Sequence, residues 1–135
     1  MASAAAKSNV RIVEDTYEAF NDGDIDTVLS SMADDIEWVE PEGSPYGDVH
    51  RGPEAVLENV FQPCLEDFAD FRVETDRFID GDDIIVVLGT FRGTNRETDK
   101  ELDVPYAHVC ELEDGRMSRF VDYSNALPML RTYEK

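Results

Sequence analysis

The chain has 135 residues, and its 31 acidic against 12 basic side chains give a formal net charge of −19. Phosphate binding needs a basic surface, so this balance excludes nucleic acid as an expected partner. No apolar run approaches the roughly 18 residues of a membrane span. We therefore expect no membrane partner and no secretory signal, but a soluble, cytoplasmic protein.

The acidic residues are scattered along the whole chain and are not gathered in a tail. Their mutual repulsion destabilises a compact state unless counterions screen it. We therefore interpret the composition as a halophilic adaptation to a salt-rich cytoplasm. The length fits one domain, and we expect residues 1–135 to form it, with a core from about residue 9 to residue 126.

Apolar residues at helical spacing predict three amphipathic helices, at residues 9–20, 24–35 and 53–68. Ser8 or Asn9 can cap the first helix, and the Asn21-Asp22-Gly23 sequence should end it. Pro63 lies inside the third helix, where proline removes a backbone donor, so we expect a bend or a restart there.

Alternating patterns predict strands at residues 36–40, 71–79, 84–91, 102–112 and 116–124. A turn-rich loop at residues 41–52 is expected to rim a site, with His50 fixing the turn before the third helix. We interpret residues 93–101 as a longer connection. Helices followed by antiparallel strands favour the α+β class.

The two cysteines, Cys64 and Cys110, lie within apolar patterns, so we expect both to be reduced core residues. Neither has the Cys or His neighbours of a zinc site, and the chain has no Gly-rich phosphate loop, HExxH pattern or nucleophile elbow. We therefore expect no metal and no cofactor. Any chemistry must come from side chains that converge in a pocket.

The strongest local signal is a hairpin around Asp114-Gly115, a pair that favours a tight turn. His108 and Asp122 each lie seven residues from Gly115, so a symmetric turn sets them opposite each other on one face of the sheet. Opposite residues have Cβ atoms roughly 5 Å apart, within reach of a side-chain hydrogen bond. A bulged turn would shift the register and send one of the two to the outer face.

Two interpretations of this pair stay open. Asp122 can take part in proton transfer, or it can be a solvated or hydrogen-bonded aspartate on the outer face of an edge strand. His108 can exchange protons while the carboxylate fixes its tautomer, or it can be a core histidine bonded to a backbone carbonyl.

The order of elements resembles the nuclear-transport-factor-2-like superfamily, and most of all its SnoaL-like branch of small polyketide cyclases and relatives of ketosteroid isomerase. The resemblance runs from about Val10 to Asn125 and includes Gly23-Asp24, Ala33-Asp34-Asp35, Trp38 with Pro41, Arg51-Gly52 and Asp114-Gly115-Arg116. It implies a cystatin-like roll, in which a cone-shaped antiparallel sheet wraps around N-terminal helices and encloses a pocket. It also implies a small-molecule ligand and a homodimer.

The same resemblance implies roles for single residues. Glu40 stands just before Pro41, where ketosteroid isomerases place their general base, and burial there should raise its pKa. Asp122 matches the aspartate that SnoaL-like cyclases use as acid and base, with His108 as its pocket neighbour. Thr16 and Tyr17 compete for the place of the oxyanion-hole tyrosine.

We expect the cavity to be lined by the aromatic side chains of Tyr17, Phe20, Trp38 and Tyr106. The outer face of the sheet carries Ala107, Val109, Val121, Arg119 and Tyr123, and it is the expected dimer surface.

Two classes of function remain, because this fold hosts both. The first is an enzyme that uses cofactor-free acid and base chemistry on a small, largely apolar carbonyl or polyketide-like substrate. The second is a non-catalytic ligand-binding or assembly protein. A pocket closed by Trp38, Phe20 and Tyr106 favours the second class, and an open pocket with two facing polar groups favours the first.

Overall fold

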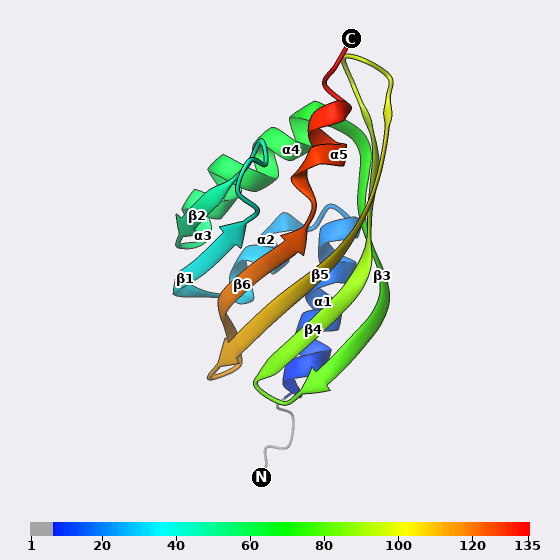
Figure 1. The fold of residues 1–135 in the computed structure, drawn as a ribbon. Helices are drawn as coiled ribbons and strands as arrows, with labels where there is room; N and C mark the ends of the chain where they lie inside the picture. Colours follow the sequence, from blue (N-terminus) through cyan, green and yellow to red (C-terminus); the bar gives the residue numbers. More distant parts are fainter. Residues whose placement is uncertain (1–6) are drawn as a thin grey trace.

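The computed structural model describes residues 7–135, in which helices pack against one curved, six-stranded sheet (Figure 1). The elements are α1 (Asn9–Asn21), α2 (Ile25–Ser30), β1 (Met32–Glu40), β2 (Asp48–Arg51), α3 (Pro53–Val56), η1 (Leu57–Phe61), α4 (Gln62–Asp67), β3 (Phe68–Gly81), β4 (Ile84–Asn95), β5 (Glu101–Glu113), β6 (Arg116–Ser124) and α5 (Ala126–Arg131). Among the described residues, no helix is both long and apolar enough to cross a membrane.

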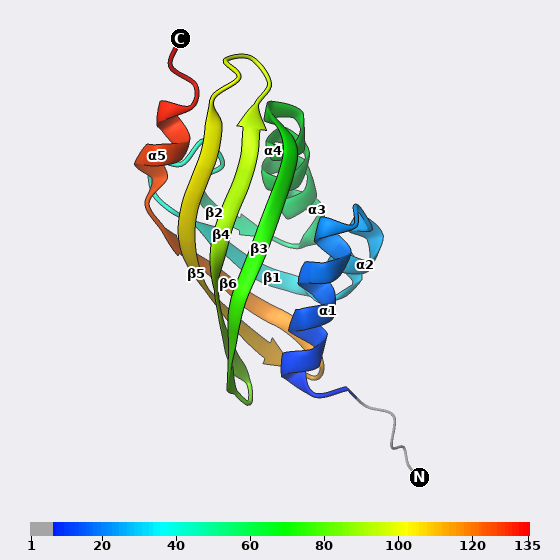
Figure 2. The ribbon, with the colours of Figure 1, turned by 90° about the vertical axis from the view of Figure 1, so that its right-hand side faces the viewer.

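The strands are ordered β2-β1-β6-β5-β4-β3 across the sheet. Neighbouring strands are antiparallel except β1 and β6, which run parallel. Figure 2 shows α1 and the helical segment from α3 to α4 on the concave side of the sheet. The predicted α+β class and curved sheet are confirmed, and the parallel pair β1–β6 is the one departure from an antiparallel sheet.

Helix α1 matches its prediction. The Ser8 hydroxyl accepts a hydrogen bond from the backbone N–H of Arg11 and so caps the first turn. At the other end, the Asn21 side chain makes two hydrogen bonds with the backbone of Val73, at 2.9 and 3.0 Å. These bonds attach the end of α1 to β3, which fixes the helix over the concave face.

The second helix is shorter than predicted. It ends at Ser30, and β1 already begins at Met32, within the stretch that we expected to be helical. The backbone N–H of Met117 donates to the carbonyl of Ser31, so pairing with β6 takes over from the local helical pattern. Residues 48–51 were also assigned wrongly to the loop, because they form β2 and pair with β1.

The third helix is continuous from Pro53 to Asp67, with a π-helical turn at η1. The backbone N–H of Gln62 bonds to the carbonyl of Leu57, five residues earlier. Pro63 follows directly and has no N–H to donate, so the wider turn accommodates the proline. Phe68, predicted at the end of this helix, instead starts β3.

The strands are longer than the alternation predicted, and pairing explains their extra length. Asn95 pairs with Phe68, and Thr94 pairs with Glu101, so β4 and β5 reach well into the expected connection at residues 93–101. Helix α5 was not predicted. Both cysteines are free and buried, as expected.

The last hairpin sets the register of the site. Asp114 and Gly115 both have positive φ, at 52° and 77°, as a two-residue turn of the hairpin type requires. The register shifts once beyond the turn, where Ser118 is the extra residue of a bulge. His108 then pairs with Asp122 on the concave face, so the predicted pairing is confirmed.

Candidate functional site

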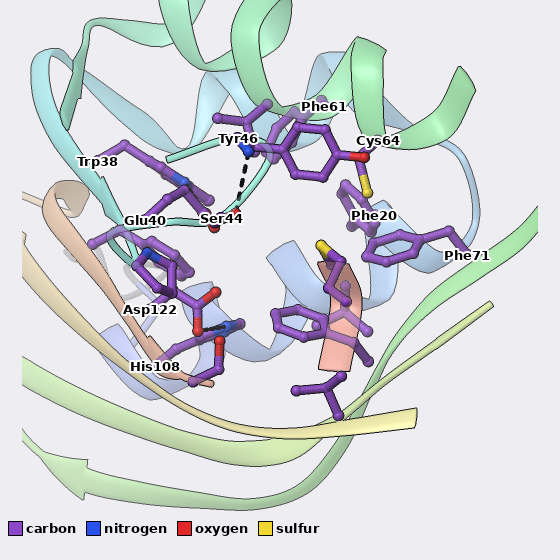
Figure 3. A pocket seen from close by; sticks show the side chains of 18 of the residues that line it. Phe20, Trp38, Glu40, Ser44, Tyr46, Phe61, Cys64, Phe71, His108 and Asp122 are labelled. Atoms are coloured by element: carbon purple, nitrogen blue, oxygen red, sulfur yellow. Dashed lines mark hydrogen bonds and ion pairs between the residues drawn. The ribbon is translucent and has the colours of Figure 1, made fainter. Parts of the chain in front are cut away.

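A deep cavity lies between the concave face of the sheet and the helices (Figure 3). Its volume is about 90 Å³. A water needs roughly 10 to 15 Å³ of such space, so several waters or a small organic molecule can fit. The walls are mainly aromatic, with Phe20, Trp38, Phe61, Phe71, Phe91 and Phe120 among them.

His108 and Asp122 project from paired strands into the deep end of this cavity, and Figure 3 shows them side by side. Nε2 of His108 lies 3.4 Å from Oδ1 of Asp122, and the two residues are only 3% and 5% exposed. The contact is close but is not aligned as a hydrogen bond, and neither atom has another partner within residues 7–135. The site therefore holds one unpaired donor-or-acceptor nitrogen and one unpaired acceptor oxygen.

Asp122 and Tyr17 together indicate which nitrogen of His108 carries the proton. The hydroxyl of Tyr17, on α1, lies 2.6 Å from Nδ1. Nε2 faces a carboxylate, which can only accept, so the proton is on Nε2 and the Tyr17 hydroxyl donates to Nδ1.

Burial holds the His108 imidazole and the Tyr17 phenol in their neutral forms. It lowers the pKa of His108, and the nearby Asp122 carboxylate opposes this effect. Burial also raises the pKa of Tyr17 well above its usual value, so the phenol keeps its proton and remains a donor.

Glu40 lies at the end of β1 and lines the same cavity. The indole N–H of Trp38 donates to its Oε2 at 2.7 Å. Burial of the carboxyl group and the charge of the neighbouring Asp122 raise the pKa of Glu40 well above its usual 4.5, as expected from the sequence. A proton on Glu40 is therefore held more tightly than on an exposed glutamate.

These groups form a polar row across the deep end of an otherwise apolar cavity. It runs from Tyr17 to His108, Asp122, Glu40 and Trp38, and its members come from α1, β5, β6 and β1. Chemically, the row combines a carboxyl group with a raised pKa, a second carboxyl group and a neutral imidazole of one tautomer. That combination can donate a proton at one point and accept one at another.

The remaining lining residues follow the expectation with one exception. Phe20 and Trp38 lie on the wall, and so do both Thr16 and Tyr17, of which Tyr17 reaches the histidine. Tyr106 does not line the cavity. Its ring stacks behind His108, with centroids 3.8 Å apart.

Gly89 on β4 leaves the space that the Tyr106 side chain occupies. The Tyr106 hydroxyl crosses over this glycine and donates to the carbonyl of Glu74 at 2.7 Å. A Cβ at position 89 would lie 2.5 Å from the Tyr106 oxygen, so only glycine leaves room. Tyr106 is therefore a support for the His108 ring and is not positioned to contact a ligand.

The mouth of the cavity includes residues that sequence reasoning missed. The 41–47 loop contributes Ser44 and Tyr46, and α5 contributes Met129. The hydroxyls of Tyr46 and Tyr133 each donate to Oδ2 of Asp67 at 2.8 Å, which fastens the loop and the C-terminal segment to the end of α4.

The sequence contains some signals for the residues at the cavity mouth. The loop composition indicated a rim, and His50 does bond to the Tyr46 carbonyl at 2.9 Å. For α5, Asn125 is a good helix cap and accepts from the N–H of Leu127, a pattern that could have predicted the helix. Among the described residues, no group of three or more His, Cys, Asp and Glu side chains could hold a metal ion.

A curved sheet over helices, with an apolar pocket and polar groups at its deep end, defines the class of nuclear-transport-factor-2-like folds. Within this class, the SnoaL-like domain matches residues 13–120, and the chain belongs to this family. No curated protein matches the chain.

Solved structures agree with this assignment. An NTF2-like protein from Burkholderia thailandensis E264 has a TM-score of 0.91 and 26% identity, covering 96% of this chain and 99% of that one. An NTF2-like protein of unknown function from Burkholderia pseudomallei K96243 has a TM-score of 0.84 and 32% identity, with 96% and 99% covered. TerC, co-crystallised with polyporic acid, has a TM-score of 0.84 and 25% identity, with 94% and 98% covered.

Proposed function

We propose that this protein is a SnoaL-like enzyme that uses cofactor-free acid and base chemistry on a small, largely apolar carbonyl or polyketide-like substrate. The observation that carries the proposal is the polar row, in which Glu40, with its raised pKa, and Asp122 share an aromatic cavity. Two acidic groups with opposite protonation states can act as acid and base at the same pH.

The chemistry that fits is proton abstraction next to a carbonyl. The Asp122 carboxylate removes a proton from the carbon beside the carbonyl, and the C–H electrons form the new carbon–carbon double bond. Glu40 gives its proton to the carbonyl oxygen, so an enol forms without a free charge on the substrate. The raised pKa suits Glu40 to this acid role, whereas the family resemblance had suggested a base.

His108 is placed to hold the substrate while protons move. Its Nε2–H faces the reacting region beside Asp122, and Tyr17 keeps the ring in that tautomer. A small-molecule ligand is also consistent with TerC, a structural neighbour that was co-crystallised with polyporic acid.

We further propose that the protein forms a homodimer through the outer face of the sheet. Tyr123 and Val49 lie on this face with 60% and 45% of their surface exposed. Within residues 7–135, the helices cover the concave face and leave the outer face open, so we propose that a second copy covers it.

The proposed reaction is tested in two steps. A thermal-shift screen of carbonyl compounds and aromatic polyketides first finds ligands, because binding to the native state raises the melting temperature. Hits are then assayed for turnover with wild type, Asp122→Asn and the surface control Asp26→Asn. Loss of the base should lower turnover about a hundredfold or more, and the control should retain it.

Full activity in Asp122→Asn would exclude the proposed base. Ligand binding without turnover in the wild-type protein would support the alternative, a non-catalytic ligand-binding protein of the same fold.

A further inference from the structure

The cavity contains carboxyl groups but no side chain that could balance them. Asp122 and Glu40 both reach it, whereas none of the described residues that line it is a lysine or an arginine. The one imidazole, His108, is held neutral by burial. An anionic ligand would therefore meet the Asp122 carboxylate with no cationic side chain beside it to offset the repulsion.

The unpaired atoms at the deep end define the ligand more closely. Nε2–H of His108 is a donor without an acceptor, and Oδ1 of Asp122 is an acceptor without a donor. Both residues are more than nine-tenths buried, and their two atoms are 3.4 Å apart. Buried polar groups that lack partners are costly, so a ligand that pairs both gains the most.

Of a ketone, an ammonium group and a hydroxyl, only the hydroxyl pairs both atoms at once. A ketone oxygen accepts from His108 but leaves Asp122 without a donor. An ammonium group donates to Asp122 but cannot accept from His108. A hydroxyl group accepts through its oxygen and donates through its hydrogen, and it can sit about 2.8 Å from each of two atoms that are this close.

The aromatic walls indicate what carries this hydroxyl. The Trp38 ring stacks on Phe120, and Phe61 packs edge-on against Trp38, with centroids 3.7 and 5.5 Å away. Such surfaces favour a flat, apolar ring.

We propose that the deep end of the cavity binds a neutral hydroxyl group carried on a small ring compound, between His108 and Asp122, and rejects anionic analogues. The inference rests on the proposed function in so far as both use this site. For a carbonyl substrate, it implies an enol or alcohol group as the part that is recognised.

The test is a ligand series that shares one ring and differs in one polar group. Benzyl alcohol, acetophenone, benzylammonium, benzoate and toluene are titrated into the wild-type protein, and affinities are measured by protein NMR shifts. We expect benzyl alcohol to bind at least about tenfold more tightly than each of the others, since each mismatch leaves a buried group unpaired.

A charge variant then checks the cause of the selectivity. Asp122→Asn should bind benzoate at least about tenfold better than wild type does, because the repelling charge is gone. Toluene affinity should stay unchanged and so reports that the cavity remains folded. If the variant does not fold, the wild-type series alone decides.

Several results would overturn the inference. Equal affinity for toluene and benzyl alcohol would mean that the cavity does not recognise the hydroxyl group. Benzoate or benzylammonium binding as tightly as the alcohol would contradict the assigned ligand charge, and so would no saturable binding of the alcohol. These experiments measure binding and not turnover. Binding can therefore contradict this inference while turnover supports the proposed reaction, and binding can support the inference while turnover is not found.

Discussion

The hydroxyl oxygen of Tyr17 lies 2.6 Å from Nδ1 of His108, although the two residues are 91 positions apart in the chain. One comes from the first helix and the other from the fifth strand. The bond therefore couples the placement of α1 over the sheet to the tautomer of the buried histidine. Packing of the fold and preparation of the site depend on the same contact.

Replacing Tyr17 with Phe removes this donor and leaves Nδ1 of His108 unpaired. We expect unfolding free energy to fall by about 1 to 3 kcal/mol, the cost of an unsatisfied buried group. Denaturant unfolding measures this loss. Because Tyr17 acts through His108, the pH dependence of turnover should also change. Asp26→Asn is the surface control, since this aspartate is exposed, and it should alter neither quantity.

The raised pKa of Glu40 makes stability depend on pH in a defined direction. The folded state keeps the Glu40 proton after the unfolded chain has lost it, so the folded state binds more protons above pH 4.5. Stability from this group is then lost as pH rises from 4.5 towards the folded pKa. Glu40→Gln has no such proton. Its free energy of unfolding should therefore rise relative to that of the wild-type protein as pH increases over this range. Parallel pH dependences for the two proteins would contradict a raised pKa.

The net charge of −19 predicts that salt stabilises the fold. Raising KCl from about 0.1 M to about 1 M shortens the screening length from about 10 Å to about 3 Å and weakens repulsion among surface carboxylates. The midpoint of urea unfolding should therefore rise steadily across this range. A midpoint that does not move with salt would exclude the halophilic interpretation.

The outer face should hold the dimer together. A glutamate in place of Tyr123 puts a charge on that face in each copy, where like charges would meet across the interface. Sedimentation at high salt should show a dimer for wild type and a monomer for Tyr123→Glu, with unchanged melting in dilute solution. A wild-type protein that sediments only as a monomer would contradict the proposal.

The sequence correctly predicted those parts of the site for which the local pattern and the long-range strand pairing agree. The pairing of His108 with Asp122 was expected from a symmetric turn around Gly115. The structure reaches it differently: a two-residue turn at Asp114-Gly115 alone would place His108 opposite Val121, and the bulge at Ser118 restores the pairing. Bulges depend on the neighbouring strand, so the alternating pattern could not predict this one.

The misassigned residues are those whose positions depend on another part of the chain. Met32 belongs to a strand because β6 pairs with it, and the residues of β2 are extended because β1 is beside them. Tyr106 is on the cavity face of the sheet, but its side chain lies behind His108 because Gly89 on the next strand leaves room for it. Periodicity reports which face a residue takes, and it does not report what space the neighbouring strand leaves.

The triangle formed by Tyr46, Tyr133 and Asp67 joins the cavity mouth to the far end of the chain. A single carboxylate oxygen receives both hydroxyls, so a ligand that moves the 41–47 loop must change the contacts of the C-terminal segment as well. A fluorophore on the exposed side chain of Lys135 would thus sit outside the cavity and still respond to what enters it. A label on this segment is therefore an optical test of whether a small molecule enters the cavity.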